Sequence, residues 1–270
     1  MDNITITFIG GGNMGRALIG GLVAGGTRAE AIHVADPSEE QRRSLADDLG
    51  VTVHADNAEA ARAADVLVVA VKPQVMDDVL ASVADAIDAE TLVISVAAGM
   101  PIRRIRKALG GHDRIVRAMP NTPALYQAGM TGLAASEGVT EIDRERASQV
   151  LEAAGEVAWV DDEALMDVVT AISGSGPAYF FSLVEQLTAA GTRAGLPEET
   201  AAKLARQTAY GAGTMMAKSD VPAGELRKRV TSPGGTTAAA LESLAENEFE
   251  RIVDEAVRVA VQRGRELGEG

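Results

Sequence analysis

Short apolar runs rich in β-branched residues alternate with longer helical patterns through the first part of the chain. The runs predict strands at Ile4–Ile9, Ala31–Ala35, Val51–His54, Val66–Val71, Leu92–Val96, Ile115–Ala118, Thr131–Ala134 and Val157–Val160. Strands separated by helices are typical of βαβ units, which build a parallel sheet covered by helices. The strand pattern stops after about Asp161.

The rest of the chain carries only helical periodicity. It predicts helices at Ala178–Ala194, Pro197–Lys218, Thr236–Glu246 and Glu248–Leu267. We therefore expect an α/β domain over residues 1–161 and an all-helical domain over residues 162–270. In the first domain, Ser38 and Gln41 have the spacing of a capping box ahead of a helix predicted over Gln41–Leu49.

A glycine-rich turn joins the first predicted strand to a helix predicted over Arg16–Ala24. Its sequence Gly10-Gly11-Gly12-Asn13-Met14-Gly15 matches G-x-G-x-x-G in the strand–turn–helix context that binds a dinucleotide. In this motif Gly10 permits the tight turn, Gly12 lets the backbone approach a pyrophosphate, and Gly15 allows close packing of helix on strand. The N–H groups at the helix start bind the anion. The pattern predicts a Rossmann-type dinucleotide-binding domain.

The second predicted strand leads into Asp36. A carboxylate at this place accepts hydrogen bonds from the adenosine ribose, which favours NAD. Ser38, Arg42 and Arg43 follow and could instead hold the 2′-phosphate of NADP, although Asp36 would repel that phosphate. The sequence leaves both NADH and NADPH open and favours NAD slightly on electrostatics.

Composition narrows the classes of function. The chain has 270 residues, 46 % of them hydrophobic, a net charge of −14 and no cysteine. The lack of cysteine excludes disulfides, thiolate metal sites and a Cys nucleophile, and it fits a reducing cytoplasm. The acidic charge disfavours nucleic acid and anionic membranes as partners. No basic n-region precedes the first strand, and no His pair or carboxylate cluster has metal-ligand spacing, so we expect a cytoplasmic protein without a metal.

Five further segments have compositions typical of binding loops. They are Ala70-Val71-Lys72-Pro73-Gln74, Ser95-Val96-Ala97-Ala98-Gly99, Arg117-Ala118-Met119-Pro120-Asn121-Thr122-Pro123, Ser173-Gly174-Ser175-Gly176-Pro177-Ala178-Tyr179 and Val230-Thr231-Ser232-Pro233-Gly234-Gly235-Thr236-Thr237. Together with the glycine-rich turn, these segments resemble the pyrroline-5-carboxylate reductase family. The resemblance covers nearly the whole chain, in order.

The resemblance implies an N-terminal Rossmann-type domain and an all-α C-terminal dimerisation domain that interleaves with a second copy. It implies a homodimer, assembled further into decamers, and a small-molecule substrate. The implied reaction is the NAD(P)H-dependent reduction of Δ1-pyrroline-5-carboxylate to L-proline, the last step of proline biosynthesis.

The resemblance also implies site residues, to which the strand-end reasoning adds. The expected cofactor residues are Ile9, Gly10, Gly11, Gly12, Asn13, Met14, Gly15, Asp36, Ser38, Asn57, Ala70, Val71, Lys72, Pro73, Val96, Ala97, Ala98 and Arg229. The expected substrate residues are Ser232, Gly235, Thr236, Thr237, Glu163 and Ser175. Thr237 is the implied proton donor.

The last segment suits this chemistry physically. Small residues from Pro233 to Thr237 directly before a helix expose N–H groups, and the helix dipole favours a substrate carboxylate there. The hydroxyl of Thr237 could then donate a proton to the ring nitrogen, or only orient it if the nitrogen arrives protonated. We expect His33, His54 and His112 to be structural or solvated.

Two alternatives remain open at this point. One is a related NAD(P)-dependent reductase of another small imino or oxo acid, and the other is a non-catalytic dinucleotide-binding protein. The predicted C-terminal helices also carry more apolar positions than a small helical domain can bury, which predicts a subunit interface. These positions are Met215, Met216, Leu226, Leu241, Leu244, Ile252, Val253, Val257 and Val261.

Overall fold

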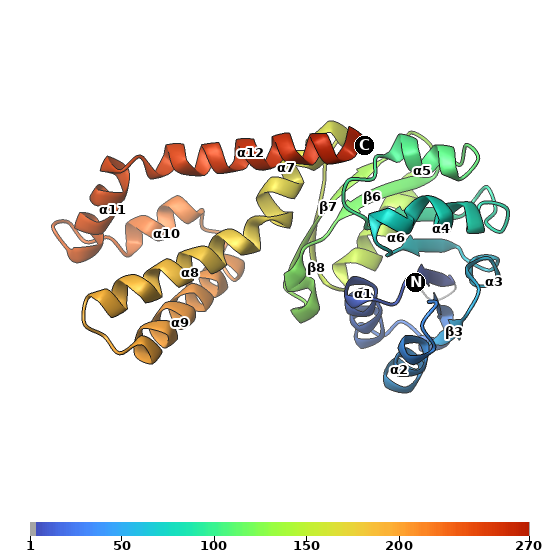
Figure 1. Ribbon diagram of the computed structural model, residues 1–270, viewed down its shortest axis with the longest axis horizontal. Helices are drawn as coiled ribbons and strands as arrows, with labels where there is room; N and C mark the ends of the chain where they lie inside the picture. Colours follow the sequence, from blue (N-terminus) through green and yellow to red (C-terminus); the bar gives the residue numbers. More distant parts are fainter. Residues whose placement is uncertain (1–3, 270) are drawn as a thin grey trace. The chain divides into compact units, whose positions relative to one another are not determined.

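The structure is a computed structural model that describes residues 4–269. The described residues contain one eight-stranded sheet in the order β3-β2-β1-β4-β5-β6-β7-β8 (Figure 1). Its strands are β1 (Ile6–Ile9), β2 (Ile32–Ala35), β3 (Thr52–His54), β4 (Val66–Val69), β5 (Leu92–Ser95), β6 (Ile115–Met119), β7 (Gly129–Ala135) and β8 (Gly155–Trp159). All eight predicted strands are therefore confirmed, with shifts of one or two residues at their ends.

Helices lie between the strands of the sheet and after its last strand. They are α1 (Asn13–Ala24), α2 (Glu39–Leu49), α3 (Asn57–Ala61), α4 (Met76–Val83), α5 (Ile102–Ala108), α6 (Glu141–Glu152) and α7 (Met166–Val169). Shorter 3-10 turns occupy Ala29–Ala31, Pro73–Val75, Thr122–Tyr126 and Glu163–Leu165, and Thr170–Gly174 forms one turn of π-helix. The strand order reverses direction between β1 and β4, as in doubly wound sheets.

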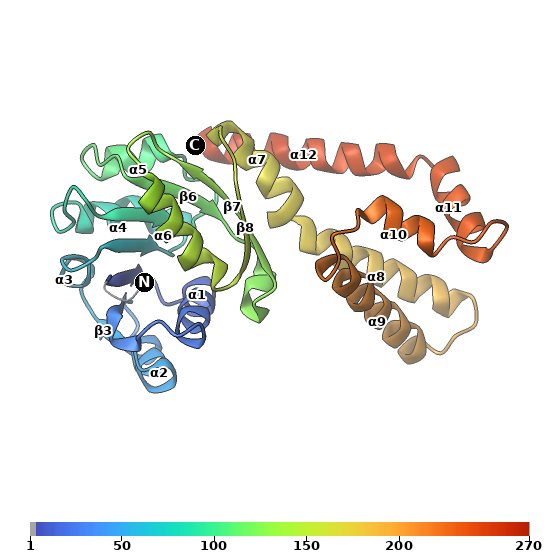
Figure 2. The ribbon, with the colours of Figure 1, turned by 180° about the vertical axis from the view of Figure 1, so that it is seen from behind.

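Helices cover both faces of the sheet (Figures 1 and 2). An apolar layer packs between the sheet and the helices on each face. Ile6 and Phe8 of β1 belong to the layer formed with α1, α2 and α6. Ile9 belongs to the opposite layer, formed with α3, α4 and α5. Because successive strand residues point to opposite faces, a strand buried on both sides is apolar at nearly every position, as β4 is.

One strand departs from the predicted parallel sheet. Strand β7 pairs with β6 in antiparallel register, with Ala118 opposite Leu133, and β8 then runs parallel to β7. The connection Pro120–Ala128 is too short for the helical crossover that joins parallel neighbours, which takes about a dozen residues or more. The short connection therefore requires β7 to run antiparallel to β6.

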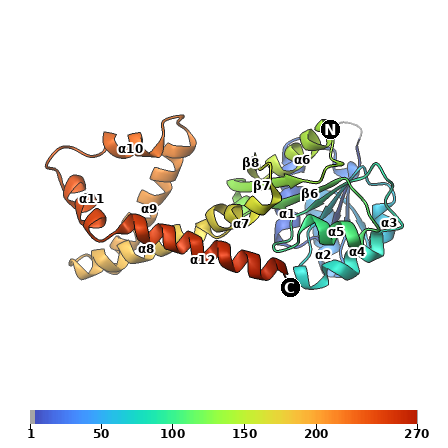
Figure 3. The same ribbon diagram turned by 90° about the horizontal axis from the view of Figure 1, so that it is seen from above.

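The helices of the second part are α8 (Gly176–Arg193), α9 (Glu198–Ala217), α10 (Ala223–Arg229), α11 (Thr236–Glu246) and α12 (Phe249–Glu269). Helices α8 and α9 run side by side, as Figures 1 and 3 show. Within the described residues of this part only Gly176, Ala201 and Ala205 are buried. A set of helices with so few buried residues leaves large apolar side chains exposed.

The chain divides into two compact units at a different place from the predicted border at residue 161. One unit comprises Met1–Gly174 with Ala260–Gly270, and the other comprises Ser175–Val259. The segment after the predicted border stays with the sheet because α7 packs on β7, where Val169 fills the space above Gly132. The end of α12 joins the first unit, where Gly264 contacts Asp167.

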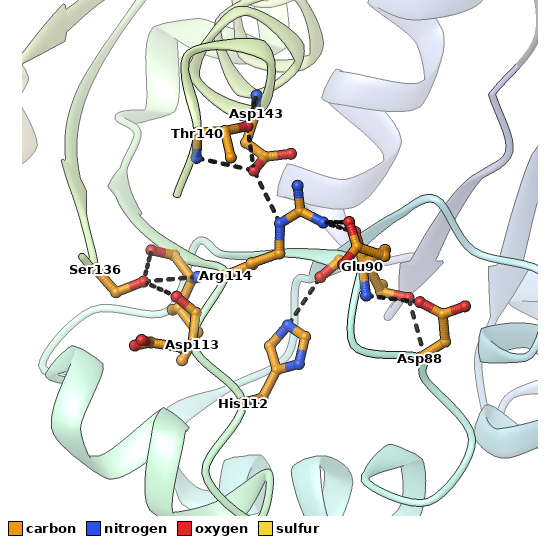
Figure 4. Close-up of polar contacts among 10 residues, drawn as sticks. Asp88, Glu90, His112, Asp113, Arg114, Ser136, Thr140 and Asp143 are labelled. Carbon is orange, nitrogen blue, oxygen red and sulfur yellow. Dashed lines mark hydrogen bonds and ion pairs between the residues drawn. The ribbon is translucent and has the colours of Figure 1, made fainter. Parts of the chain in front are cut away.

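A buried polar cluster fastens α6 to the start of β6 (Figure 4). The carboxylate of Asp143, fully buried, accepts hydrogen bonds from the N–H of Thr140 at 3.0 Å and from its hydroxyl at 2.8 Å. It also pairs with the Arg114 guanidinium at 3.0 Å, and Arg114 reaches on to Glu90. Thr140 and Asp143 thus form a capping box that is tied to a strand.

The predicted capping box at Ser38 and Gln41 forms only in part. The Ser38 hydroxyl caps α2 by accepting from the Gln41 N–H at 3.2 Å. The Gln41 side chain does not return to Ser38, because its amide donates instead to the Gly11 carbonyl in the glycine-rich turn.

None of the described helices is long and apolar enough to cross a bilayer.

Candidate active site

Four loops that were predicted to bind a coenzyme leave the sheet at one edge. The ends of β2, β1, β4 and β5 are in register, with Ile9 opposite both Ala35 and Val69, and Val69 opposite Ser95. The next residues along each strand are therefore neighbours: Asp36, Gly10, Ala70 and Val96. This is the carboxyl edge at the switch point of a doubly wound sheet, where ligands bind.

The three motif glycines meet different surroundings in the turn. Gly10 has φ +102°, a conformation that favours glycine, and a Cβ there would lie 2.6 Å from the Ala70 carbonyl oxygen. A Cβ on Gly15 would lie 2.4 Å from the Gly10 carbonyl oxygen, so this glycine is required for close packing. Gly12 has nothing within 4 Å of its Cβ position. Its open side suits the approach of a pyrophosphate.

Helix α1 begins directly after this open glycine. Its N-cap is Gly12, which offers no side-chain cap, and its first turn has no acidic residue. The first N–H groups of a helix have no partner within the helix, and together with the helix dipole they attract an anion. The turn therefore fits the pyrophosphate of a dinucleotide.

Asp36 and Gln41 hold the turn from the side of β2. The Asp36 carboxylate accepts from the Gly11 N–H at 2.9 Å and from the Ser38 N–H at 2.9 Å. The Gln41 amide donates to the Gly11 carbonyl. The backbone N–H and the backbone carbonyl of Gly11 therefore both have side-chain partners. A Cβ on Gly11 would lie 2.4 Å from a methyl carbon of Leu45, which shows how closely α2 packs on the turn.

The predicted cofactor residues after β4 are arranged around an exposed loop. The Ala70 N–H donates to the Ile9 carbonyl at 2.8 Å, and Lys72 is exposed ahead of the turn Pro73–Val75. Asn57 starts α3, and its amide donates to the Ser82 hydroxyl at 3.1 Å. The charge of Lys72 is available at this edge for an anionic ligand.

An ion pair contacts the end of the loop that follows β5. Arg117, buried on β6 beside Ser95, donates to the Glu163 carboxylate at 3.0 Å. The same Glu163 oxygen accepts from the Ile102 N–H at 2.8 Å, where the loop from Val96 ends and α5 begins. Glu163 thus has two partners within the first unit, and its contact with a substrate stays a prediction.

The predicted substrate loop in the second unit is a tight turn leading into α11. The Gly235 N–H donates to the Ser232 carbonyl at 3.0 Å, and Gly234 has φ +68°. Pro at the second position and a positive φ at the third are the marks of a type II turn. The N-cap Gly235 again offers no side-chain cap, and Thr237 lies half-buried in the first turn of α11. This helix start fits a carboxylate.

The other predicted residues lie as follows. Ser175 precedes α8 without capping it, and Arg229 ends α10 in an exposed ion pair with Glu225 at 3.8 Å.

His33 and His54 face each other across β2 and β3 at 3.3 Å, and burial beside His54 lowers the pKa of His33. Among residues 4–269, no three His, Asp or Glu side chains are grouped so that they could hold a metal ion.

Comparison with known proteins agrees with this geometry over the whole chain. Residues 163–267 match the family described as pyrroline-5-carboxylate reductase dimerisation, and residues 5–99 match the family described as NADP oxidoreductase, coenzyme F420-dependent. The pyrroline-5-carboxylate reductase of Pseudomonas aeruginosa is 48 % identical to this chain, covering 100 % of the chain and 98 % of the relative. The chain belongs to the pyrroline-5-carboxylate reductase family.

Solved reductases share this fold along their full length. The pyrroline-5-carboxylate reductase of Coxiella burnetii has a TM-score of 0.95 at 40 % identity, covering 98 % of this chain and 99 % of that one. The pyrroline carboxylate reductase of Plasmodium falciparum, described with NADP bound, has a TM-score of 0.83 at 33 % identity, covering 99 % of each chain. The match to a dimerisation family indicates that this reductase is an oligomer.

Two residues next to the candidate coenzyme site make contacts that the sequence pattern does not predict. The sequence pattern predicts a helix-capping role for Gln41, whereas its side-chain amide donates to the Gly11 carbonyl of the glycine-rich turn. The ion pair of Arg117 has no local sequence pattern, because its partner Glu163 lies 46 residues away in the sequence. A charged residue inside an apolar strand was the available signal for Arg117.

Proposed function

We propose that this chain catalyses the NAD(P)H-dependent reduction of Δ1-pyrroline-5-carboxylate to L-proline, the last step of proline biosynthesis. The observation that carries the proposal is the 48 % identity with a pyrroline-5-carboxylate reductase over both units of the chain. The uncapped helix starts at Gly12 and Gly235 support it, since the reaction requires two anionic ligands.

The coenzyme is assigned to the edge of the sheet in the first unit. The N–H groups at Gly12, Asn13 and Met14 bind its pyrophosphate, and Asp36 binds the adenosine ribose. The loops at Ala70–Pro73 and Val96–Ala98 hold its ribose and nicotinamide, because they leave the neighbouring strands β4 and β5. The bound reduced nicotinamide supplies the hydride.

The substrate is assigned to the turn before α11. The N–H groups of Gly235, Thr236 and Thr237 bind the substrate carboxylate with help from the helix dipole. The turn Ser232–Gly235 holds these groups in place before the substrate arrives, which lowers the entropic cost of ordering it.

Thr237 is the residue assigned to the ring nitrogen. Hydride addition to the carbon of the C=N bond moves the π electron pair to nitrogen, which must end with a proton. The Thr237 hydroxyl either donates that proton or, for a substrate already protonated on nitrogen, accepts a hydrogen bond from it and orients the ring. Its place in the first turn of α11 puts the hydroxyl beside the carboxylate-binding N–H groups.

The assembly is proposed to be a homodimer through the second unit, with further association into decamers. The exposed apolar side chains of α8, α9 and α12 support an interface there, among them Phe180, Phe181, Leu204, Tyr210 and Ile252. We place the enzyme in the cytoplasm, in keeping with a chain that has no cysteine.

The reaction is tested with the purified full chain, Δ1-pyrroline-5-carboxylate and NADH or NADPH in parallel. We expect oxidation of the coenzyme to depend on the imine and to produce proline in equal amount. A chain that binds coenzyme but leaves this imine untouched while reducing another imino or oxo acid would overturn the substrate assignment. One that reduces none of these acids would be a dinucleotide-binding protein without this activity.

A further inference from the structure

The surroundings of Asp36 bear on the choice between NADH and NADPH, which the sequence leaves open. NADH and NADPH differ only in the 2′-phosphate on the adenosine ribose. The residues that follow the second strand of a dinucleotide-binding sheet contact this position and distinguish the two coenzymes. In this chain those residues are Asp36 and the start of α2, all within the first unit.

The Asp36 carboxylate is fixed in place by two backbone donors. Its Oδ2 accepts from the Gly11 N–H and its Oδ1 accepts from the Ser38 N–H, each at 2.9 Å. The first donor belongs to the glycine-rich turn itself, so the carboxylate lies against the loop that binds the coenzyme. An ionised carboxylate has about four acceptor sites, and two of them remain for the ribose hydroxyls.

Turning Asp36 away would break both of these hydrogen bonds. Rotation of the Asp36 side chain to make room for a phosphate is therefore unfavourable here. A 2′-phosphate carries about −1.5 to −2 charges. Beside a fixed carboxylate it meets a repulsion that weakens binding by on the order of tenfold or more.

The arginines that could offset this repulsion are already engaged. The Arg42 guanidinium donates to the carbonyl oxygens of Asp36 at 2.7 Å and Pro37 at 3.1 Å. Arg43 pairs with Glu39 at 2.7 Å on the exposed side of α2. Both side chains would have to leave these partners to reach a phosphate.

We propose that Asp36 makes this chain an NADH-preferring reductase and is its main determinant of coenzyme specificity. The proposal rests on the function proposed above in taking a nicotinamide coenzyme as the hydride donor. The geometry at Asp36, however, concerns coenzyme binding alone, so binding can be measured whether or not the chain reduces the proposed imine.

The test measures the dissociation constants of NADH and NADPH for the full-length chain by calorimetry at one pH and salt concentration. AMP and 2′,5′-ADP, which is AMP with a second phosphate at the 2′ position, serve as probes of the adenosine end alone. We expect NADH and AMP to bind at least about tenfold more tightly than their 2′-phosphorylated counterparts, NADPH and 2′,5′-ADP. Equal or tighter binding of NADPH would overturn the proposal.

Two variants assign the effect to the carboxylate. Asp36→Asn removes the charge and keeps an acceptor for the Gly11 N–H, and Asp36→Ser also makes room for a phosphate. We expect both to tighten NADPH binding relative to NADH by about tenfold or more, since the repulsion is gone. Circular dichroism and thermal unfolding check that each variant keeps the fold.

The matched control is Asp47→Asn, which removes one charge from an exposed position on the same helix α2. We expect it to leave the ratio of the two dissociation constants within about twofold, because exposed charges are screened by salt. A control that changes the ratio as much as Asp36→Asn would mean that net charge sets the preference, and would overturn the proposal.

Activity separates this proposal from the proposed function. A chain that reduces the imine equally well with both coenzymes keeps the function and loses the preference. A chain that binds NADH over NADPH but reduces no imine keeps the preference and loses the function. Both results are readable from the same protein preparation.

Discussion

At the scale of single residues, the glycine-rich turn separates a structural from a functional requirement for glycine. Gly15 has no room for a Cβ because the Gly10 carbonyl oxygen would lie 2.4 Å away. Gly12 has φ −66° and open space on its Cβ side, so nothing in the chain itself requires a glycine there. The role proposed for Gly12 is therefore to admit a ligand.

This contrast predicts opposite effects for two alanine variants. Gly15→Ala should lower the free energy of unfolding by about 1–3 kcal/mol through overpacking. Gly12→Ala should change stability by less than about 0.5 kcal/mol and weaken coenzyme binding about tenfold or more. Thermal unfolding and calorimetric titration of NADH check both. Coenzyme binding by Gly12→Ala at wild-type affinity would contradict the assignment of the pyrophosphate to this turn.

Thr237 allows a second prediction at this scale. Thr237→Ala removes the hydroxyl assigned to the ring nitrogen and should lower kcat at least about tenfold. The dissociation constant of NADH should stay within about twofold of the wild-type value, because the residues assigned to the pyrophosphate, ribose and nicotinamide under the proposed function lie in the first unit. Thr237→Ser, which keeps the hydroxyl, should recover most of the activity. Loss of coenzyme binding in the alanine variant would instead place Thr237 in the coenzyme site.

At the scale of elements, the sequence predicts what local pattern determines. The eight strands were found because β-branched runs are bounded by turn residues, and the helix Thr236–Glu246 was found with its observed bounds. The antiparallel direction of β7 was missed, although the short connection Pro120–Ala128 signals it. The pairing of Glu163 with Arg117 depends on tertiary contact and has no local signal.

The polar cluster at Asp143 predicts a stability effect that depends on pH. Burial alone would raise the pKa of Asp143, but the N–H and hydroxyl of Thr140 and the Arg114 guanidinium hold that pKa below its usual 3.8. A carboxyl with a lowered pKa in the folded state stabilises the protein above about pH 4, and this contribution is lost as the pH falls further. Acid should therefore weaken the attachment of α6.

Asp143→Ala tests this contribution. It removes the carboxylate half of the capping box, although the Thr140 hydroxyl still caps the helix, and it leaves Arg114 without its buried partner, so we expect a loss of about 2–4 kcal/mol in unfolding free energy at pH 7. The loss should shrink as the pH falls below about 4, because the carboxyl of the unfolded chain takes up a proton there and the folded carboxyl does so at still lower pH. Glu90→Gln, at an exposed partner of Arg114, is the control and should cost less than about 1 kcal/mol. A pH-independent loss would contradict the role of the charge.

At the scale of the whole molecule, the net charge of −14 coexists with binding of anionic ligands. The glycine-rich turn and the segment Val230–Thr237 contain no acidic residue, so attraction comes from helix starts and N–H groups. Asp36 is the exception, and in the proposed site its charge lies where the two coenzymes differ. The acids lie mostly on helices, among them Glu39, Glu40 and Asp47 of α2.

The second unit predicts the state of association. Its three buried residues cannot stabilise five helices, and a stable interface that covers their apolar side chains needs about 1,200–2,000 Å². Light scattering at micromolar concentration should therefore give at least twice the chain mass of 28.0 kDa. A stable monomer at that concentration would contradict the proposed interface.

The central claim, reduction of the imine by hydride transfer, is tested most directly with a deuterium label. The purified chain is given Δ1-pyrroline-5-carboxylate and NADH carrying deuterium at both hydrogens of the reduced nicotinamide carbon, and the proline formed is analysed by mass spectrometry and NMR. We predict one deuterium per proline, bound to the former imine carbon. Proline without deuterium, or no proline at all, would contradict the account.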